Sequence, residues 1–118
     1  MMTVEDVRRI LRAELVCGDE KRQTEVHNAC GSDMMSDVLA FVKDQSVLLT
    51  GLVNPQVIRT AEMMDMVCIV FVRGKIPSED MLELAAETDT CILQTKMTMF
   101  NACGILYQAG LRGGEHHG

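Results

Sequence analysis

Apolar residues recur along this chain with two alternating periods, one typical of amphipathic helices and one typical of buried strands. Val4, Val7 and Leu11 share one helical face near the N-terminus. Thr3 is placed to cap that helix. The central segment 67–72 (VCIVFV) is continuously apolar, as expected of a strand covered on both faces. The whole pattern predicts helices beginning near residues 3, 32, 54, 77 and 97, and strands over 15–17, 25–29, 46–51, 67–72 and 91–93.

Strands that alternate with helices of about ten residues favour right-handed crossovers, which make neighbouring strands parallel. The sequence therefore predicts an α/β fold with a small, mainly parallel sheet and helices on both faces. Ser32 or Asp33 is the expected N-cap of the second helix. The last helix is expected to place six residues against the body of the protein: Met97, Phe100, Gly104, Leu106, Tyr107 and Leu111.

The 118 residues suit one domain, and 47% hydrophobic residues can form a core without metal or disulfide support. We expect a single domain over residues 1–111 and a flexible Gly/His tail over 112–118, which contains His116 and His117. No apolar run reaches the ~20 residues that cross a bilayer, and the N-terminus has no signal-peptide core. The protein is expected to be cytoplasmic.

The formal net charge of −6 bears on which classes of partner the protein is expected to bind. Binding to nucleic acid depends on clustered Lys and Arg, and anionic membranes attract the same residues. The charge therefore argues against both nucleic acid and membrane as partners.

The five cysteines are dispersed, odd in number and never spaced as paired metal ligands. This pattern is typical of reduced thiols and predicts no metal site. A minor alternative is a thiol redox sensor that uses Cys30 or Cys103. Cys30 is the better placed of the two, because it lies just ahead of a predicted helix start.

The familiar catalytic motifs are missing. The chain contains no GxxxxGK[ST], no GxGxxG after its first strand and no GxSxG. His27 and Cys30 could form a catalytic dyad, but a structural role beside a turn is the commoner use of such residues. The sequence therefore predicts no enzyme activity and no cofactor.

Small polar residues follow several predicted strands. In open α/β sheets, ligands bind outside the carboxyl ends of the strands, where loops and helix starts offer N–H groups. The alternative is that each residue serves as a cap or turn. The predicted ligand-binding residues are Gly31, Ser32, Asp33, Ser36, Asp37, Thr50, Asn54, Gly74 and Thr95.

Three stretches together resemble the DRTGG domain: GSDMMSDVLAFVKDQSVLLTG, AEMMDMVCIVFVRGKIPSEDMLELAAE and NACGILYQAGL. The similarity covers residues 1–111, and its most specific part is 32–40. It implies a three-layer α/β/α sandwich similar to the N-terminal, non-catalytic domain of HPr kinase/phosphorylase. The motif that names the family falls at 24–31, which here reads TEVHNACG. An anion contact through a double-glycine turn is therefore not expected there.

Members of this family occur in the same proteins as CBS domains and phosphotransacetylase domains, and this implies a regulatory role without catalysis. The first hypothesis is thus a regulatory module that binds a nucleotide or other anion and self-associates as a homodimer or higher homo-oligomer. The second is a pure interaction or dimerisation domain without ligand, whose exposed apolar patch would include Met63 or Met66. The sequence identifies no partner protein.

Overall fold

The computed structural model describes residues 1–40 and 45–113. Its elements follow one another along the chain as the helical and strand periods predict, with short additional pieces near the N-terminus. They are β1 (Met2–Thr3), α1 (Val4–Ile10), β2 (Glu14–Cys17), the 3-10 helix η1 (Asp19–Lys21), β3 (Glu25–Val26), β4 (Asn28–Gly31), α2 (Met35–Leu39), β5 (Ser46–Thr50), α3 (Pro55–Met63), β6 (Cys68–Phe71), α4 (Glu79–Glu87), β7 (Cys91–Gln94) and α5 (Met99–Gln108).

The main sheet has five strands in the order β2-β7-β6-β5-β4. The four strands from β4 to β7 are parallel, and β2 alone runs antiparallel, pairing Leu15 with Leu93 of β7. A second, two-stranded antiparallel sheet joins β1 to β3. The predicted mainly parallel sheet is confirmed.

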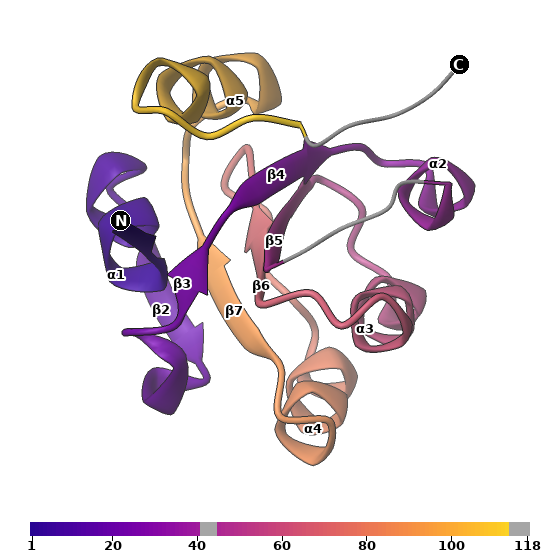
Figure 1. Ribbon diagram of the computed structural model, residues 1–118. Helices are drawn as coiled ribbons and strands as arrows, with labels where there is room; N and C mark the ends of the chain where they lie inside the picture. The colour runs from indigo at the N-terminus through magenta and orange to yellow at the C-terminus, as the bar shows by residue number, and fades with distance from the viewer. Residues whose placement is uncertain (41–44, 114–118) are drawn as a thin grey trace.

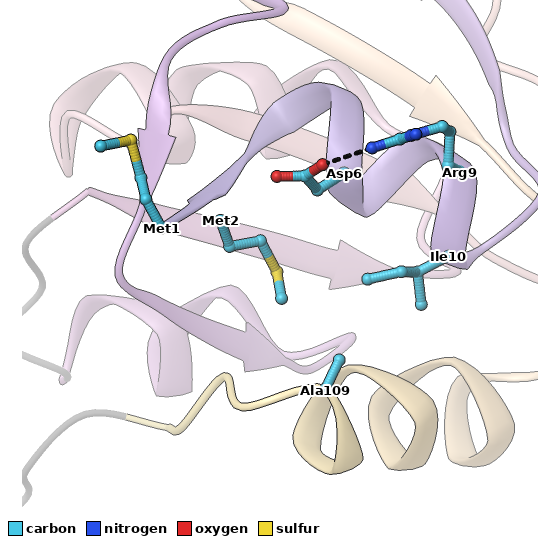
Figure 2. Close-up of a pocket in the computed structure, with 6 residues that line it drawn as sticks. All are labelled: Met1, Met2, Asp6, Arg9, Ile10 and Ala109. Carbon is cyan, nitrogen blue, oxygen red and sulfur yellow. Dashed lines mark hydrogen bonds and ion pairs between the residues drawn. The ribbon is translucent and has the colours of Figure 1, made fainter.

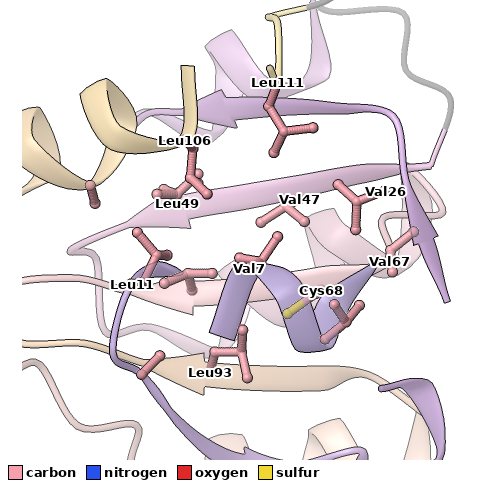
Figure 3. Close-up of a cluster of buried hydrophobic side chains, with 14 of the residues drawn as sticks. Val7, Leu11, Val26, Val47, Leu49, Val67, Cys68, Leu93, Leu106 and Leu111 are labelled. Atoms are coloured by element: carbon pink, nitrogen blue, oxygen red, sulfur yellow. The ribbon is translucent and has the colours of Figure 1, made fainter. Parts of the chain in front are cut away.

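Helices cover both faces of the main sheet (Figure 1): α1 and α5 lie on one face, and α2, α3 and α4 lie on the other. Side chains of β5 alternate between the faces, so Val47 and Leu49 pack towards α1 and α5 whereas Leu48 packs towards α3. Figure 3 shows the first of these layers, where Val7 and Leu106 meet the sheet. The protein is a three-layer α/β/α sandwich.

The start of α2 differs from the prediction. Met34 is the N-cap, and its side chain forms no capping hydrogen bond. Ser32 instead accepts a hydrogen bond from the Met34 amide (2.9 Å), and Asp33 bonds to the loop after β5. The prediction of Ser32 or Asp33 as the cap is therefore wrong, because Ser32 bonds to the amide of the cap residue itself and Asp33 bonds to a different loop, so neither side chain reaches the first amides of the helix.

The orientation of α5 also differs. Ala102 and Leu106 form its buried face, whereas Phe100 and Tyr107, predicted to pack inwards, are 85% and 58% exposed. The reason is that residues 97–111 contain no charged side chain, so the sequence does not distinguish the inner from the outer face.

The chain after α5 returns to the sheet edge. The Ala29 amide of β4 donates to the Arg112 carbonyl (2.9 Å), and Asn28 and Arg112 form a parallel bridge. Arg112, placed in the tail by the sequence, is thus bonded to β4, and residues 114–118 lie outside the described residues. Within the described ranges, no helix is long and apolar enough to cross a membrane.

Candidate functional site

The loops after β4 and β5 are joined by the carboxylate of Asp33. Its Oδ1 accepts hydrogen bonds from the Gly51 amide (2.7 Å) and the Thr50 hydroxyl (3.0 Å). The buried Thr50 Oγ1 in turn accepts from the Leu52 amide (3.1 Å). These polar groups satisfy one another, so this half of the sheet's carboxyl edge is closed by internal bonds.

Arg73 lies over the same loop from β6. The guanidinium is close enough to Gly51 that a Cβ at residue 51 would collide with Nη2, and Nη2 is 3.7 Å from Asp33 Oδ2. Arg73 has a positive φ of 59°, and its amide donates to the Met97 carbonyl (2.7 Å). The arginine therefore links the β6 loop both to the closed half and to the segment before α5.

The other half of the edge is built on Thr95. Its side chain is buried, its hydroxyl donates to the Leu11 carbonyl (2.7 Å), and Oγ1 accepts from the Met97 amide (3.2 Å). The Gly74 amide donates to the Thr95 carbonyl (2.9 Å), with Gly74 at a φ of +70° that favours glycine. Thr95 thus ties together the ends of α1, β6 and β7.

A pocket of about 620 Å³, here called the β7 pocket, opens beside Thr95. Two of its lining residues, Arg12 and Lys96, are exposed cations that form no ion pair within residues 1–40 and 45–113. Glu14 is its one carboxylate. The full lining is Leu11, Arg12, Glu14, Gly74, Ile76, Gln94, Thr95, Lys96 and Met97.

The predicted ligand-binding residues do not gather in one place. Gly74 and Thr95 line the β7 pocket, and Asp33 and Thr50 bond to each other in the closed half. Of the others, Ser32 bonds to Met34 as described, Asn54 caps α3 by accepting from the Gln56 amide (2.8 Å), Ser36 and Asp37 are exposed on α2, and Gly31 ends β4 against the Cys103 thiol. As ligand contacts, these residues stay predictions.

Arg12 and Glu14 were missed by the sequence reasoning. They reach the β7 pocket because β2 is antiparallel to β7, which sets Glu14 opposite Gln94, the last residue of β7. The turn between α1 and β2 therefore lies at the carboxyl end of β7. The one feature of the sequence that points to this arrangement is the short predicted strand directly after the first helix. Its residues do not specify which strand it pairs with or in which direction it runs.

A second pocket, of about 490 Å³, lies between α1 with the residues before it and the end of α5 (Figure 2). Its charged side chains are already paired: Arg9 Nη2 is 2.7 Å from Asp6 Oδ1, and Asp6 Oδ2 accepts from the Thr3 amide (2.9 Å). Asp6 and Thr3 form the capping box of α1. The polar side chains of this pocket form the cap and an ion pair of α1. The β7 pocket is therefore the better candidate for a charged ligand.

The thiols give the redox hypothesis little support. None of the five cysteines is in a disulfide. Cys30 is 7% exposed within β4, and burial raises the pKa of half-buried Cys103. The Cys68 thiol lowers the pKa of Cys91 through a hydrogen bond, but both are buried in adjacent strands. A reactive sensor needs a low pKa and solvent access together.

The His27 ring is hydrogen-bonded to Glu25, with 2.8 Å between Nε2 and Oε2. Among the described residues, no group of three or more His, Cys, Asp and Glu side chains is arranged to hold a metal ion.

The structure is similar to a solved regulatory region that contains two kinds of domain. This is the crystal structure of the CBS and DRTGG domains of the regulatory region of Clostridium perfringens pyrophosphatase, complexed with the activator diadenosine tetraphosphate. The TM-score is 0.73 at 16% sequence identity, and the similarity covers 91% of this chain and 46% of that one. This chain thus spans about half the length of that region. At this identity, the likeness shows the fold.

Sequence comparison gives the family. No curated protein matches this chain. The DRTGG domain matches residues 6–109, which is most of the sequence. The chain therefore belongs to the DRTGG domain family.

Proposed function

We propose that this protein is a non-catalytic, cytoplasmic regulatory module that binds a phosphate-bearing small molecule, such as a nucleotide, in the β7 pocket. One observation carries the proposal. Arg12 and Lys96 line a concave site at the carboxyl end of β7 without an ion-pair partner in the described chain. Cations of this kind favour an anionic ligand locally, against the overall net charge of −6.

The remaining lining suits the other parts of a nucleotide. Ile76 and Met97 offer apolar surface for a base, while Glu14 and Gln94 supply hydrogen-bond acceptors for hydroxyl or amino groups. A volume of about 620 Å³ lies within the range of small-molecule sites. The nucleotide activator bound to the similar pyrophosphatase region supports the same ligand class.

The position of the pocket suits regulation, because its walls come from three segments. They are the turn after α1, the loop after β6 and the loop between β7 and α5. A ligand held by all three restrains α1 and α5 relative to the sheet. We propose that this restraint acts on self-association.

Binding can be tested by calorimetry with AMP, ATP, diadenosine tetraphosphate and inorganic phosphate. Arg12→Gln and Lys96→Gln should each weaken nucleotide binding at least tenfold, and added salt should weaken it further. Arg59→Gln is the matched control, because it also removes one positive charge but lies on α3, where Arg59 is 3.9 Å from Glu62. Absence of nucleotide binding, or equal affinity in all three variants, would reject the proposal.

A pure interaction domain is the second candidate, and one observation favours it. Phe100 and Tyr107 of α5 are 85% and 58% exposed, and the Arg112 guanidinium lies 3.9 Å from the centre of the Tyr107 ring. The methionines expected to form an exposed apolar patch do not do so together, because Met66 is buried whereas Met63 is exposed on α3.

A further inference from the structure

A small cavity between α5 and β4 has no part in the proposed function. It measures about 180 Å³, and Leu49, Leu106 and Leu111, all buried, line it. Figure 3 shows Leu106 beside Leu49 in this layer of the protein. A cavity of about 150 Å³ with walls of this kind stays dry and binds benzene, so the present cavity has room for an apolar body of about six carbon atoms.

The chain after α5 forms one wall of this cavity and is bonded on both sides. The Leu111 amide donates to the Leu106 carbonyl of α5 (3.1 Å), and the Ala29 amide of β4 donates to the Arg112 carbonyl (2.9 Å). Arg112 and Gly113 line the cavity from this wall. The wall is therefore fixed to both α5 and β4, and the cavity between them is part of the fold.

Arg112 is the one charged residue among those that line the cavity in the described chain. Its guanidinium lies 3.9 Å from the centre of the Tyr107 ring, and Nη1 donates to the carbonyls of Tyr107 (2.9 Å) and Leu111 (2.8 Å). Within residues 1–40 and 45–113, Nε and Nη2 form no hydrogen bond and no carboxylate pairs with Arg112. Nε and Nη2 form an edge that can donate two parallel hydrogen bonds to a carboxylate.

We propose that this cavity binds a small monocarboxylate with an apolar body of about six carbon atoms, such as hexanoate. The body fills the space between the leucines and displaces water that finds few polar partners there. The carboxylate lies against the free edge of the exposed Arg112 guanidinium. A single cation matches a single negative charge, which favours a carboxylate over a phosphate ester of charge about −2. The site shares no residue with the β7 pocket.

Saturation-transfer NMR with hexanoate, hexanol and acetate tests the chemistry of this site. Hexanoate should bind with a dissociation constant of about 1 mM or lower. Hexanol should bind at least about fivefold more weakly, because it lacks the charge that Arg112 recognises. Acetate should show no binding up to about 50 mM, because it has no body to fill the cavity.

Variants separate the contribution of the cation from that of the cavity. Arg112→Gln should weaken hexanoate binding at least about fivefold and leave hexanol unchanged. Cys103→Leu places a larger side chain in the cavity wall and should weaken both ligands. Arg59→Gln is the matched control on α3 and should change neither.

Three results would overturn the inference: no hexanoate binding to the wild type, equal affinity for hexanoate and hexanol, or full hexanoate affinity in Arg112→Gln. Loss of hexanoate binding in Arg12→Gln in place of Arg112→Gln would also overturn it, because the carboxylate would then lie in the β7 pocket. Nucleotide affinity should be unchanged in Arg112→Gln, so the two sites can be tested independently.

Two cysteines locate the ligand within the molecule. Cys103 lines the cavity and Cys17 of β2 does not, and both thiols are half-buried. Burial raises the pKa of each, so labelling with iodoacetamide is best followed at about pH 9. Saturating hexanoate should slow the labelling of Cys103 at least about fivefold, measured by peptide mass spectrometry, and leave Cys17 unchanged. Equal slowing at both cysteines, or none at Cys103, would contradict the assignment.

Discussion

The hydroxyl of Thr95 shows what one buried polar atom does in this protein. It donates to the last turn of α1 and accepts from the segment before α5, so two loops depend on it. A buried carbonyl or amide that loses its partner costs about 1–3 kcal/mol. This makes Thr95 a structural support of the β7 pocket, in addition to a residue that lines it.

Thr95→Val should therefore destabilise the protein by about 1–3 kcal/mol, because valine keeps the shape and removes both hydrogen bonds. The measurement is the free energy of unfolding in urea. Thr95→Ser is the control, since it retains the hydroxyl and should lose less. Equal stability of the two variants would show that the bonds contribute nothing.

Asp33 illustrates the difference between the predicted and the observed residue roles. The sequence predicts Asp33 and Thr50 as ligand contacts, and the structure shows their side chains bonded to each other and to the Gly51 amide. The pattern could place these residues after strands, but it could not show that their polar groups are already satisfied. For the same reason, it could not show that the cations of the neighbouring pocket have no ion-pair partner among the described residues.

Asp33→Ala should lower the free energy of unfolding by about 1–2 kcal/mol, because it leaves the Gly51 amide and Thr50 hydroxyl without their acceptor. Asp37→Ala is the matched control, since that carboxylate is exposed and forms no hydrogen bond or ion pair within the described chain. It should change the stability by less than about 0.5 kcal/mol. Neither variant should alter nucleotide affinity, and a large loss of binding in Asp33→Ala would move the ligand to the β4–β5 side.

At the scale of elements, α1 is held to the segment around η1 by a shared carboxylate. Glu5 lies between two arginines, with 2.6 Å from Oε2 to Arg8 Nη2 and 2.5 Å from Oε1 to Arg22 Nη1. The Glu5 amide also donates to the Arg22 carbonyl (2.9 Å). The hydrogen bond from Arg8, followed by that from Arg22, lowers the pKa of Glu5 from 4.5 to about 2.

This shift predicts a specific acid response. Because the folded pKa of Glu5 lies below its ordinary value, its contribution to stability is present above about pH 4.5 and is lost as the pH falls towards 2. Urea unfolding from pH 7 to pH 2 should show Glu5→Gln less stable than the wild type at neutral pH, with the difference shrinking on acidification.

Glu83→Gln removes an exposed carboxylate of α4 that forms no ion pair among the described residues, and serves as the control. Its difference from the wild type should stay small and nearly constant. A Glu5→Gln deficit that is independent of pH would contradict the assignment of the shift to the two arginines.

For the whole molecule, the class of fold was predictable because buried helices and buried strands leave different patterns of apolar residues in the sequence. Val67 to Val72 is apolar throughout, and the structure covers β6 on both faces. The direction of the edge strand β2 could not be predicted from the sequence, since β2 carries no residue that specifies an antiparallel partner. That single unseen pairing decided which loop joins the candidate site, and so accounts for the missed Arg12 and Glu14.

The placement of β2 also has a consequence for the order of assembly. β2 precedes the four parallel strands in the chain, yet its partner in the sheet is β7, the last of them. Residue 94 is synthesised after residue 14, so β2 cannot pair with β7 until β7 has left the ribosome. The turn that carries Arg12 is fixed only at that final step. A nascent or truncated chain that lacks β7 therefore has no β7 pocket. Only a chain that includes β7 could bind a ligand there.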